Sequence, residues 1–253
     1  MVFTNTKQMS KKDKGFYIFN ITLSFLMSAA CVALAFYYGL VNNWNNRLFS
    51  AIIISVVSIL PFVLQLIIRK RFPNILFLGI NVYILFAGVL GSAANLYYVL
   101  PWYDIVIHTI MGYCVAMVGL FLICGVDEHK KMSPIFVALF CLFFSFGVEL
   151  LWEIIERFAD VFLSQTAQGP KIDGTNAPLV SDTIEDLICN LSGALLFFVH
   201  FVIDRFTKLK LGFDYIIKDF ESSLKGRKKD KKQDKNDEKT AIETDKDDPN
   251  NSQ

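Results

Sequence analysis

Six long apolar stretches run through this chain, and each is about long enough to cross a bilayer as a helix. A spanning helix needs about 20 mostly apolar residues, because each residue adds only about 1.5 Å along the axis. With 53% hydrophobic residues, a single soluble core could not bury all six stretches. The sequence therefore predicts an all-α, polytopic membrane protein with six transmembrane helices, near Phe16–Leu40, Leu48–Ile68, Ile75–Tyr98, Tyr103–Gly125, Pro134–Phe158 and Asp182–Ile203.

Basic residues are distributed unevenly among the segments that flank these stretches. They cluster before the first stretch and after the second, the fourth and the sixth, as in Lys11 to Lys14, Arg69 to Arg71, Lys130 and Lys131, and the tail. The alternate loops hold only Arg47, Arg157 and Lys171. Because loops rich in Lys and Arg stay on the cytoplasmic side, both the N- and C-termini are predicted to be cytoplasmic, and the loops after helices one, three and five to lie outside.

Composition divides the chain into four segments. Residues 1–15 are a basic cytoplasmic segment, and residues 16–204 form the six-helix transmembrane domain. Over residues 205–224, apolar positions recur at near-helical spacing among lysines, which predicts an amphipathic helix on the membrane surface. Residues 225–253 are almost wholly charged or polar and cannot bury enough apolar area to fold, so we predict a disordered charged tail.

Acidic residues, an asparagine and a histidine lie at helical spacing inside three of the apolar stretches. An ionised side chain near the bilayer centre costs about 2.5 to 3.5 kcal/mol, so residues kept at such positions are expected to have a function. Those that share one helix face are Asp104 and His108, then Glu149, Glu153 and Glu156, then Asp182, Asp186 and Asn190. The predicted topology brings all three sets to overlapping depths in the outer leaflet. We therefore expect one polar site that opens outward.

The residue types in this site favour cation chemistry. Carboxylates crowded into a dry interior repel one another and need compensation from protons, a metal ion or a cationic substrate. One imidazole with several oxygen ligands suits Mn, Fe, Mg or Zn, so a divalent metal ion is a candidate cofactor. The candidate catalytic residues and metal ligands are His108, Glu149, Glu153 and Asp186. The candidate substrate-binding residues are Asp104, Asp182 and Asn190.

Each candidate has an expected role. His108 is a metal ligand or general base, and Glu149 and Glu153 are ligands or proton carriers. Asp186 is a ligand or an orienting carboxylate, and Asn190 donates a hydrogen bond to substrate. Asp104 and Asp182 have an alternative as N-caps of their helices, where a carboxylate accepts from free backbone amides.

Three motifs carry a resemblance to a known family. They are Asp104-x-x-x-His108-x-x-x-Gly112, Glu149-Leu-Leu-Trp-Glu153, and the run Asp-Thr-Ile-Glu-Asp-Leu-Ile-Cys-Asn-Leu-Ser-Gly-Ala that begins at Asp182. Together they resemble the YjdF-like family of uncharacterised bacterial membrane proteins, over helices three to six. The resemblance implies a multi-pass protein of the bacterial cytoplasmic (plasma) membrane, with a link to the cell envelope or to glycopeptide susceptibility.

A more distant resemblance is to VanZ-like proteins. Asp186, Asn190 and Gly193 fit the pattern of one VanZ helix. The pattern of another VanZ helix is not matched, because Trp152 stands where that family has glutamine.

The leading functional hypothesis is a membrane protein whose outward-facing site binds a cation or a polar lipid-linked group and carries out metal-assisted or acid/base chemistry on it. Two alternatives remain open: a proton- or cation-coupled transporter that uses the carboxylates as a relay, and a non-catalytic membrane interaction protein. The expected partner is the lipid bilayer. The sequence has no glycine-rich phosphate loop and no Cys/His zinc spacing, and nothing in it supports nucleic-acid binding.

Overall fold

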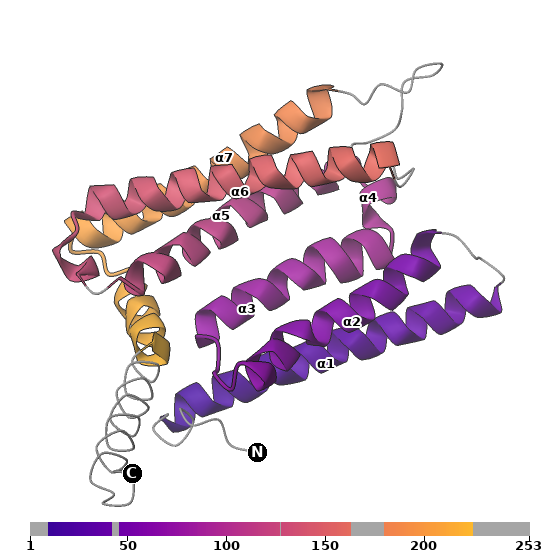
Figure 1. Ribbon diagram of the computed structural model, residues 1–253, viewed down its shortest axis with the longest axis horizontal. Helices are drawn as coiled ribbons and strands as arrows, with labels where there is room; N and C mark the ends of the chain where they lie inside the picture. Colours follow the sequence, from indigo (N-terminus) through magenta and orange to yellow (C-terminus); the bar gives the residue numbers. More distant parts are fainter. Residues whose placement is uncertain (1–9, 42–45, 127, 163–179, 225–253) are drawn as a thin grey trace, which may run out of the picture.

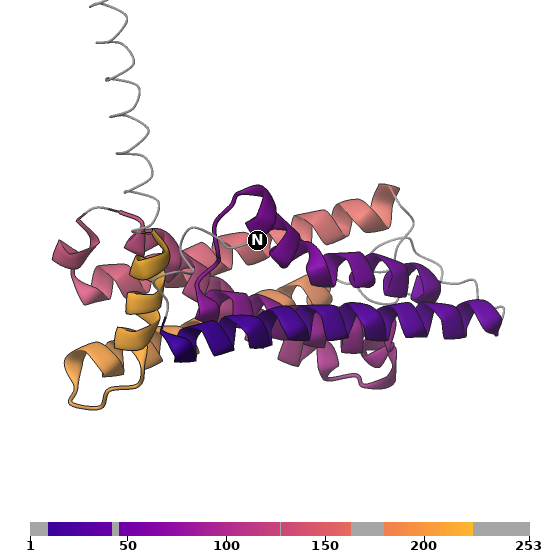
Figure 2. The same ribbon diagram turned by 90° about the horizontal axis from the view of Figure 1, so that it is seen from below.

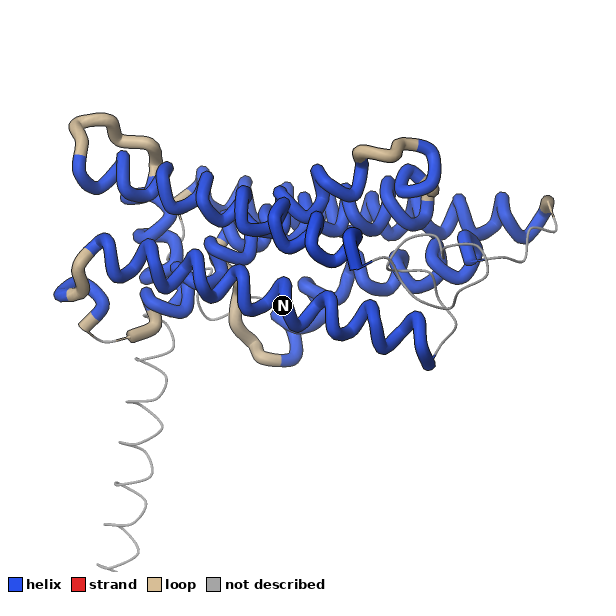
Figure 3. Tube along the Cα trace, turned by 90° about the horizontal axis from the view of Figure 1, so that it is seen from above, coloured by secondary structure: helices blue, strands red, loops and turns tan. Residues whose placement is uncertain are grey.

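The computed structural model describes residues 10–41, 46–126, 128–162 and 180–224. These residues form helices and contain no strand, as Figure 3 shows. The elements are α1 (Lys11–Leu40), α2 (Asn46–Ile67), α3 (Asn74–Tyr83), the π-helix η2 (Ile84–Ala93), α4 (Leu96–Val99), α5 (Tyr103–Cys124), the short turn η3 (His129–Lys131), α6 (Pro134–Phe162) and α7 (Val180–Phe206). A further helix covers residues 213–224.

Six of the described helical segments are long and apolar enough to span a bilayer, which confirms the predicted all-helical polytopic fold. They are Lys11–Leu40, Arg47–Ile67, Asn74–Ala93, Tyr103–Cys124, Pro134–Phe158 and Asp182–Phe206. The third span ends earlier than the predicted Tyr98, because Asn95 adopts the left-handed conformation with φ of 70°. Asparagine tolerates this conformation better than most residues, but a residue in the left-handed conformation cannot continue a right-handed helix. The short α4 follows it.

The long helices run side by side in two groups of three, which Figure 1 and Figure 2 show from two directions. The first group consists of α1, α2 and the continuous pair α3 and η2, and its core includes Met27, Cys31 and Leu48. The second group consists of α5, α6 and α7, and its core includes Leu120 and Phe197. The predicted polar site lies in the second group.

The helix over residues 213–224 packs across the end of the bundle where α1 begins (Figure 1). Phe213 and Phe220 are fully buried in the core of the second group. Asp219 forms an ion pair with Arg71 at 3.4 Å and accepts a hydrogen bond from the backbone N–H of Ile75 at 3.1 Å. This helix therefore joins the two groups, and its apolar face packs on protein. Contact of its other face with the membrane stays a prediction.

The described chain begins and ends at this same end of the bundle, in agreement with an even number of spans (Figure 1). That this end is the cytoplasmic one stays a prediction from the distribution of basic residues. α1 already begins at Lys11, inside the predicted basic segment. Residues 1–9 and the predicted disordered tail at 225–253 lie outside the described residues.

Glu221 attaches the terminal helix to the turn η3, and this attachment is expected to depend on pH. Its carboxylate contacts His129 Nε2 at 3.1 Å and Lys130 Nζ at 3.0 Å. Burial acts to raise the pKa of Glu221, but the hydrogen bonds from Lys130 and His129 outweigh it and lower the pKa below its usual range. A carboxyl with a lowered folded-state pKa stabilises the fold above its ordinary pKa, and that stabilisation is lost as pH falls through the lowered value.

We therefore expect the hydrogen-exchange protection of residues 213–224 to fall on acidification from neutral pH to about pH 3, once intrinsic exchange rates are corrected for. The variant Glu221→Gln should lose this part of the pH dependence, because its side chain does not titrate. Equal pH dependence in the two proteins would contradict the assignment.

Candidate functional site

The structure brings the polar faces of three helices together around the imidazole of His108. His108 lies on α5 and is 5% exposed, Glu149 and Glu153 lie on α6 and are 0% and 3% exposed, and Asp186 lies on α7 and is 3% exposed. These residues are near the starts of α5 and α7 and in the second half of α6. The cluster therefore lies toward the end of the bundle opposite the helix over residues 213–224 (Figure 1).

Each ring nitrogen of His108 faces a different partner. Nδ1 is hydrogen-bonded to Oε1 of Glu149, whose other oxygen, Oε2, accepts a hydrogen bond from Nδ2 of Asn190 at 2.8 Å. Nε2 lies 3.4 Å from Oδ1 of Asp104 and 3.7 Å from Oδ1 of Asp186. Both oxygens of Glu149 are thus engaged, while Nε2 points between two carboxylates from different helices.

Asn190 is itself held by Ser145, a residue that the sequence analysis missed. The Ser145 hydroxyl donates to the backbone carbonyl of Gly112 at 2.9 Å and lies 3.3 Å from Oδ1 of Asn190. Ser145 is fully buried and sits four residues before Glu149, on the same face of α6. That spacing was the available signal.

Two glycines let α5 and α7 come into backbone contact beside the site. A Cβ atom on Gly112 would lie 2.0 Å from the carbonyl oxygen of Asn190, and one on Gly193 would lie 1.9 Å from the carbonyl oxygen of Thr109. Membrane helices approach closely where such small residues meet. This contact sets Asn190 and Asp186 of α7 beside His108.

Glu153 is a buried carboxylate that lies close to a hydrogen-bond donor, the hydroxyl of Thr183. Neither Glu153 oxygen, however, has a partner at ideal hydrogen-bond geometry among the residues that the structure describes. Buried polar groups normally have partners, because leaving one unpaired is costly. A proton, a water molecule or a cation at this position would remove that cost.

The ligand atoms fall into two overlapping groups, within each of which they lie no more than 4.8 Å apart. One group is Asp104, His108 and Asp186, and the other is His108, Glu149 and Glu153. Two ligands about 2.1 Å from a tetrahedral ion are separated by about 3.4 Å. The two contacts of His108 Nε2 match this separation and are long for hydrogen bonds. The first group therefore fits a single divalent ion.

The remaining predicted site residues lie at the edge of this cluster. The side chain of Asp104 is 38% exposed. The N-cap residue of α5 is Trp102, so Asp104 lies within the first turn of the helix. Asp182 lies in the first turn of α7 and is half-buried; it contributes to the electrostatic field at Asp186 but belongs to neither ligand group. Neither aspartate is the N-cap residue of its helix.

Tyr83, on α3, is a residue of the first group of helices that contacts α5 near the site. Its hydroxyl donates to the sulfur of Met111 at 3.4 Å, and the carboxylates of Glu149 and Asp104 contribute to its electrostatic environment. The sequence analysis did not identify Tyr83, because a tyrosine in an apolar stretch is most simply explained by packing.

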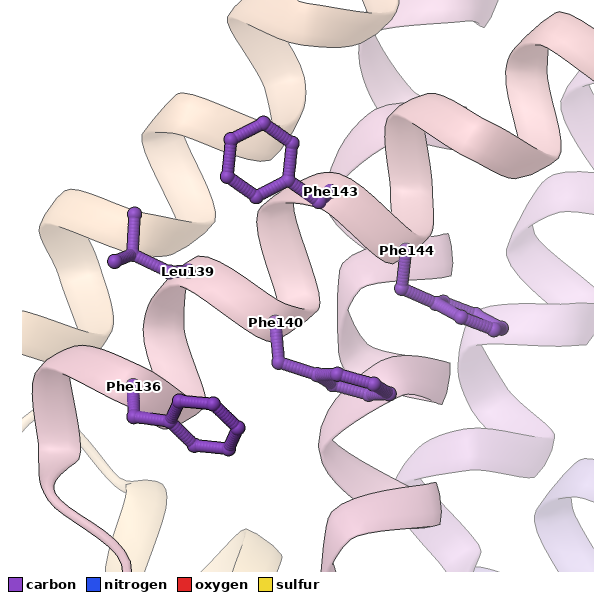
Figure 4. A pocket seen from close by; sticks show the side chains of 5 residues that line it. All are labelled: Phe136, Leu139, Phe140, Phe143 and Phe144. Atoms are coloured by element: carbon purple, nitrogen blue, oxygen red, sulfur yellow. The ribbon is translucent and has the colours of Figure 1, made fainter.

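An apolar hollow of about 480 Å³ lies on the first part of α6, apart from the carboxylates. It is lined by Phe136, Leu139, Phe140, Phe143 and Phe144, as Figure 4 shows. Three of these side chains are strongly exposed. A face of this kind is what a membrane helix presents to lipid chains, so the hollow is not part of the polar site.

Comparison with known protein families identifies a match over most of the chain. The model of a family described as "Predicted membrane protein (DUF2238)" matches residues 21–205, a range that includes every candidate site residue. No curated protein and no solved structure matches the chain.

Proposed function

Because this chain belongs to the DUF2238 family of predicted membrane proteins, the YjdF-like family that its motifs resemble, we propose that it is an integral membrane protein whose buried polar site binds a metal ion. The site binds one divalent metal ion between Nε2 of His108 and the carboxylates of Asp104 and Asp186. The protein lies in the bacterial cytoplasmic membrane with both termini in the cytoplasm, so that the ion faces outward. The likeness to VanZ-like proteins stays a prediction.

The observation that carries this proposal is the placement of the two aspartates around one ring nitrogen. Separations of 3.4 and 3.7 Å suit ligands that share an ion better than they suit direct hydrogen bonds. Three helices meet at this point and each carries an acidic residue; those of α6 and α7, Glu149 and Asp186, are buried, and uncompensated charge is expensive there. A divalent cation supplies the compensation that these residues need.

Glu149 acts in this arrangement as the group that orients His108. By accepting at Nδ1 it leaves the lone pair of the neutral imidazole on Nε2, directed toward Asp104 and Asp186. A carboxylate behind a metal-bound histidine is a common support of metal sites, because it fixes both the tautomer and the ring orientation. One imidazole with two carboxylates suits the borderline ion Zn²⁺, and its oxygen ligands also suit the harder Mn²⁺.

The transporter alternative receives less support. On the inner side of Ser145 and Asn190, the described core of α5, α6 and α7 contains Ala116, Leu120, Cys141 and Phe197, which are at most 1% exposed. Polar groups of these helices on that side include Tyr113, which is hydrogen-bonded to His200 at 2.7 Å, and the buried Asp204. Neither His200 nor Asp204 has a hydrogen bond to the carboxylate cluster among the described residues. A relay of protons or cations needs polar groups along its path. We therefore propose a metal centre rather than a transporter.

Elemental analysis of the detergent-purified protein tests the proposal. We expect about one divalent transition-metal ion per chain. His108→Ala and Asp186→Asn should each lose most of it, because each variant removes a ligand. The matched control is Glu156→Gln: Glu156 lies on α6 and pairs with Trp152 at 2.7 Å, so this variant should keep the ion. A protein without an ion after incubation with Zn²⁺ or Mn²⁺ would overturn the proposal, as would full occupancy in His108→Ala.

A further inference from the structure

We infer that this metal centre is hydrolytic, with Glu153 as the general base and an ester of an amphipathic lipid as the class of substrate. The inference rests on the proposed metal ion. It goes beyond ion binding, because it assigns a reaction to the site and a catalytic role to a carboxylate that the ion does not use.

The number of protein ligands is the first argument. Among the residues that the structure describes, His108, Asp104 and Asp186 supply three ligand atoms to this group. Structural zinc sites are usually closed by four protein ligands, whereas catalytic sites have three and keep a fourth position for water or substrate. A centre with three protein ligands therefore leaves one coordination position at which water or substrate can bind and react.

The state of Glu153 is the second and independent argument. Glu153 is 3% exposed, and neither of its oxygens has a partner at ideal hydrogen-bond geometry among the described residues, although the Thr183 hydroxyl lies close by. A Glu153 oxygen lies within 4.8 Å of a ring nitrogen of His108, and Glu153 is close enough to Asp186 to act on it electrostatically, so Glu153 lies beside the ion position without belonging to its ligand group. Glu153 can thus receive a proton from a water at the site without being a ligand itself.

The reaction balances with water as its only co-reactant. A metal ion held by His108, Asp104 and Asp186 would favour ionisation of a water molecule bound beside it. Glu153 takes one proton from this water, and the water oxygen forms a bond to the carbonyl carbon or the phosphorus of the ester. The bond between that atom and the alcohol oxygen then breaks, and Glu153 returns its proton to the departing alcohol. No oxidation state changes.

The entrance to the site indicates the substrate class. Asp104, the most exposed ligand, lies at the start of α5, next to Ile105, which is 44% exposed, and close to Trp102, which is 54% exposed. Exposed tryptophans at helix ends mark the level of the lipid headgroups. A substrate that reaches the ion at this level has its reactive ester at headgroup depth and its apolar chain in the bilayer.

Two chromogenic amphiphiles in detergent micelles test this inference: para-nitrophenyl laurate for an acyl ester and dodecyl para-nitrophenyl phosphate for a phosphoester. The metal-loaded wild-type protein should cleave one of them, and the one cleaved identifies the bond. Glu153→Gln should keep its metal ion but lose at least about 100-fold in rate, the usual contribution of a general base. Glu153→Asp, which keeps the acid but shortens it, should fall between the two, and Glu156→Gln should match the wild type.

Metal content separates the possible failures. A wild-type protein that holds its ion and cleaves neither amphiphile overturns the hydrolytic inference and leaves the metal centre standing. A Glu153→Gln variant that holds its ion and keeps the wild-type rate overturns the role of Glu153. A protein that binds no ion overturns the proposed function itself.

Discussion

Replacing either of the glycines between α5 and α7 with alanine should destabilise the protein by about 3 kcal/mol, the upper range of overpacking effects. The new Cβ atom of Gly112→Ala would lie 2.0 Å from a backbone oxygen of α7, and that of Gly193→Ala 1.9 Å from one of α5. Neither neighbour is a flexible side chain, so the two helices must move apart. In detergent, we expect a thermal midpoint about 6 to 12 °C lower than that of the wild type.

Gly147→Ala is the matched control for this prediction. Gly147 lies on α6 of the same group of helices, but a Cβ atom placed there has nothing within 4 Å. Alanine also favours a helix more than glycine does, so its midpoint should equal or exceed that of the wild type. Equal midpoints for all three variants would mean that α5 and α7 are not in backbone contact.

The second large effect is expected from Glu149→Gln, which should weaken metal binding by about 10- to 100-fold. Glu149 accepts from both His108 and Asn190, whereas a glutamine has one acceptor oxygen and must turn its NH₂ group toward one of these donors. The imidazole then loses its fixed orientation toward Asp104 and Asp186. Calorimetric titration of the metal-free protein with Zn²⁺ measures the change in affinity.

Glu185→Gln serves as the control for Glu149→Gln. It removes one carboxylate next to Asp186 in the sequence, but Glu185 is exposed, so its charge is screened and its loss should change the affinity little. If both variants bind Zn²⁺ as tightly as the wild type, Glu149 does not orient the ligand.

The helical spans and the three polar faces could be predicted from the sequence, because both depend on local periodicity. The spacing of Asp104 and His108, or of Asp186 and Asn190, fixes the face of a helix on which they lie. It does not fix how that helix is rotated against its neighbours. The meeting of the three faces needed the assumption that polar residues avoid lipid, and the backbone contact at Gly112 and Gly193 is what brings two of them together.

Features that depend on single contacts could not be predicted in this way. The engagement of both Glu149 oxygens and the lack of ideal hydrogen-bond partners at Glu153 depend on atomic positions that helical spacing does not determine. The end of the third span at Ala93 was hidden because the residues after Asn95 are as apolar as those before it. Tyr83 reaches the site only because the two groups of helices pack together.

The position of the helix over residues 213–224 has a consequence for the order of events during biosynthesis. Its partners Arg71 and Ile75 belong to the first half of the chain, which enters the membrane early, whereas Asp219 leaves the ribosome after all six spans. Until then, the Arg71 guanidinium must stay in water, since burying it without a counter-charge is unfavourable. Docking of this helix is therefore a late step of assembly, and it closes its end of the bundle only after the six spans have been inserted.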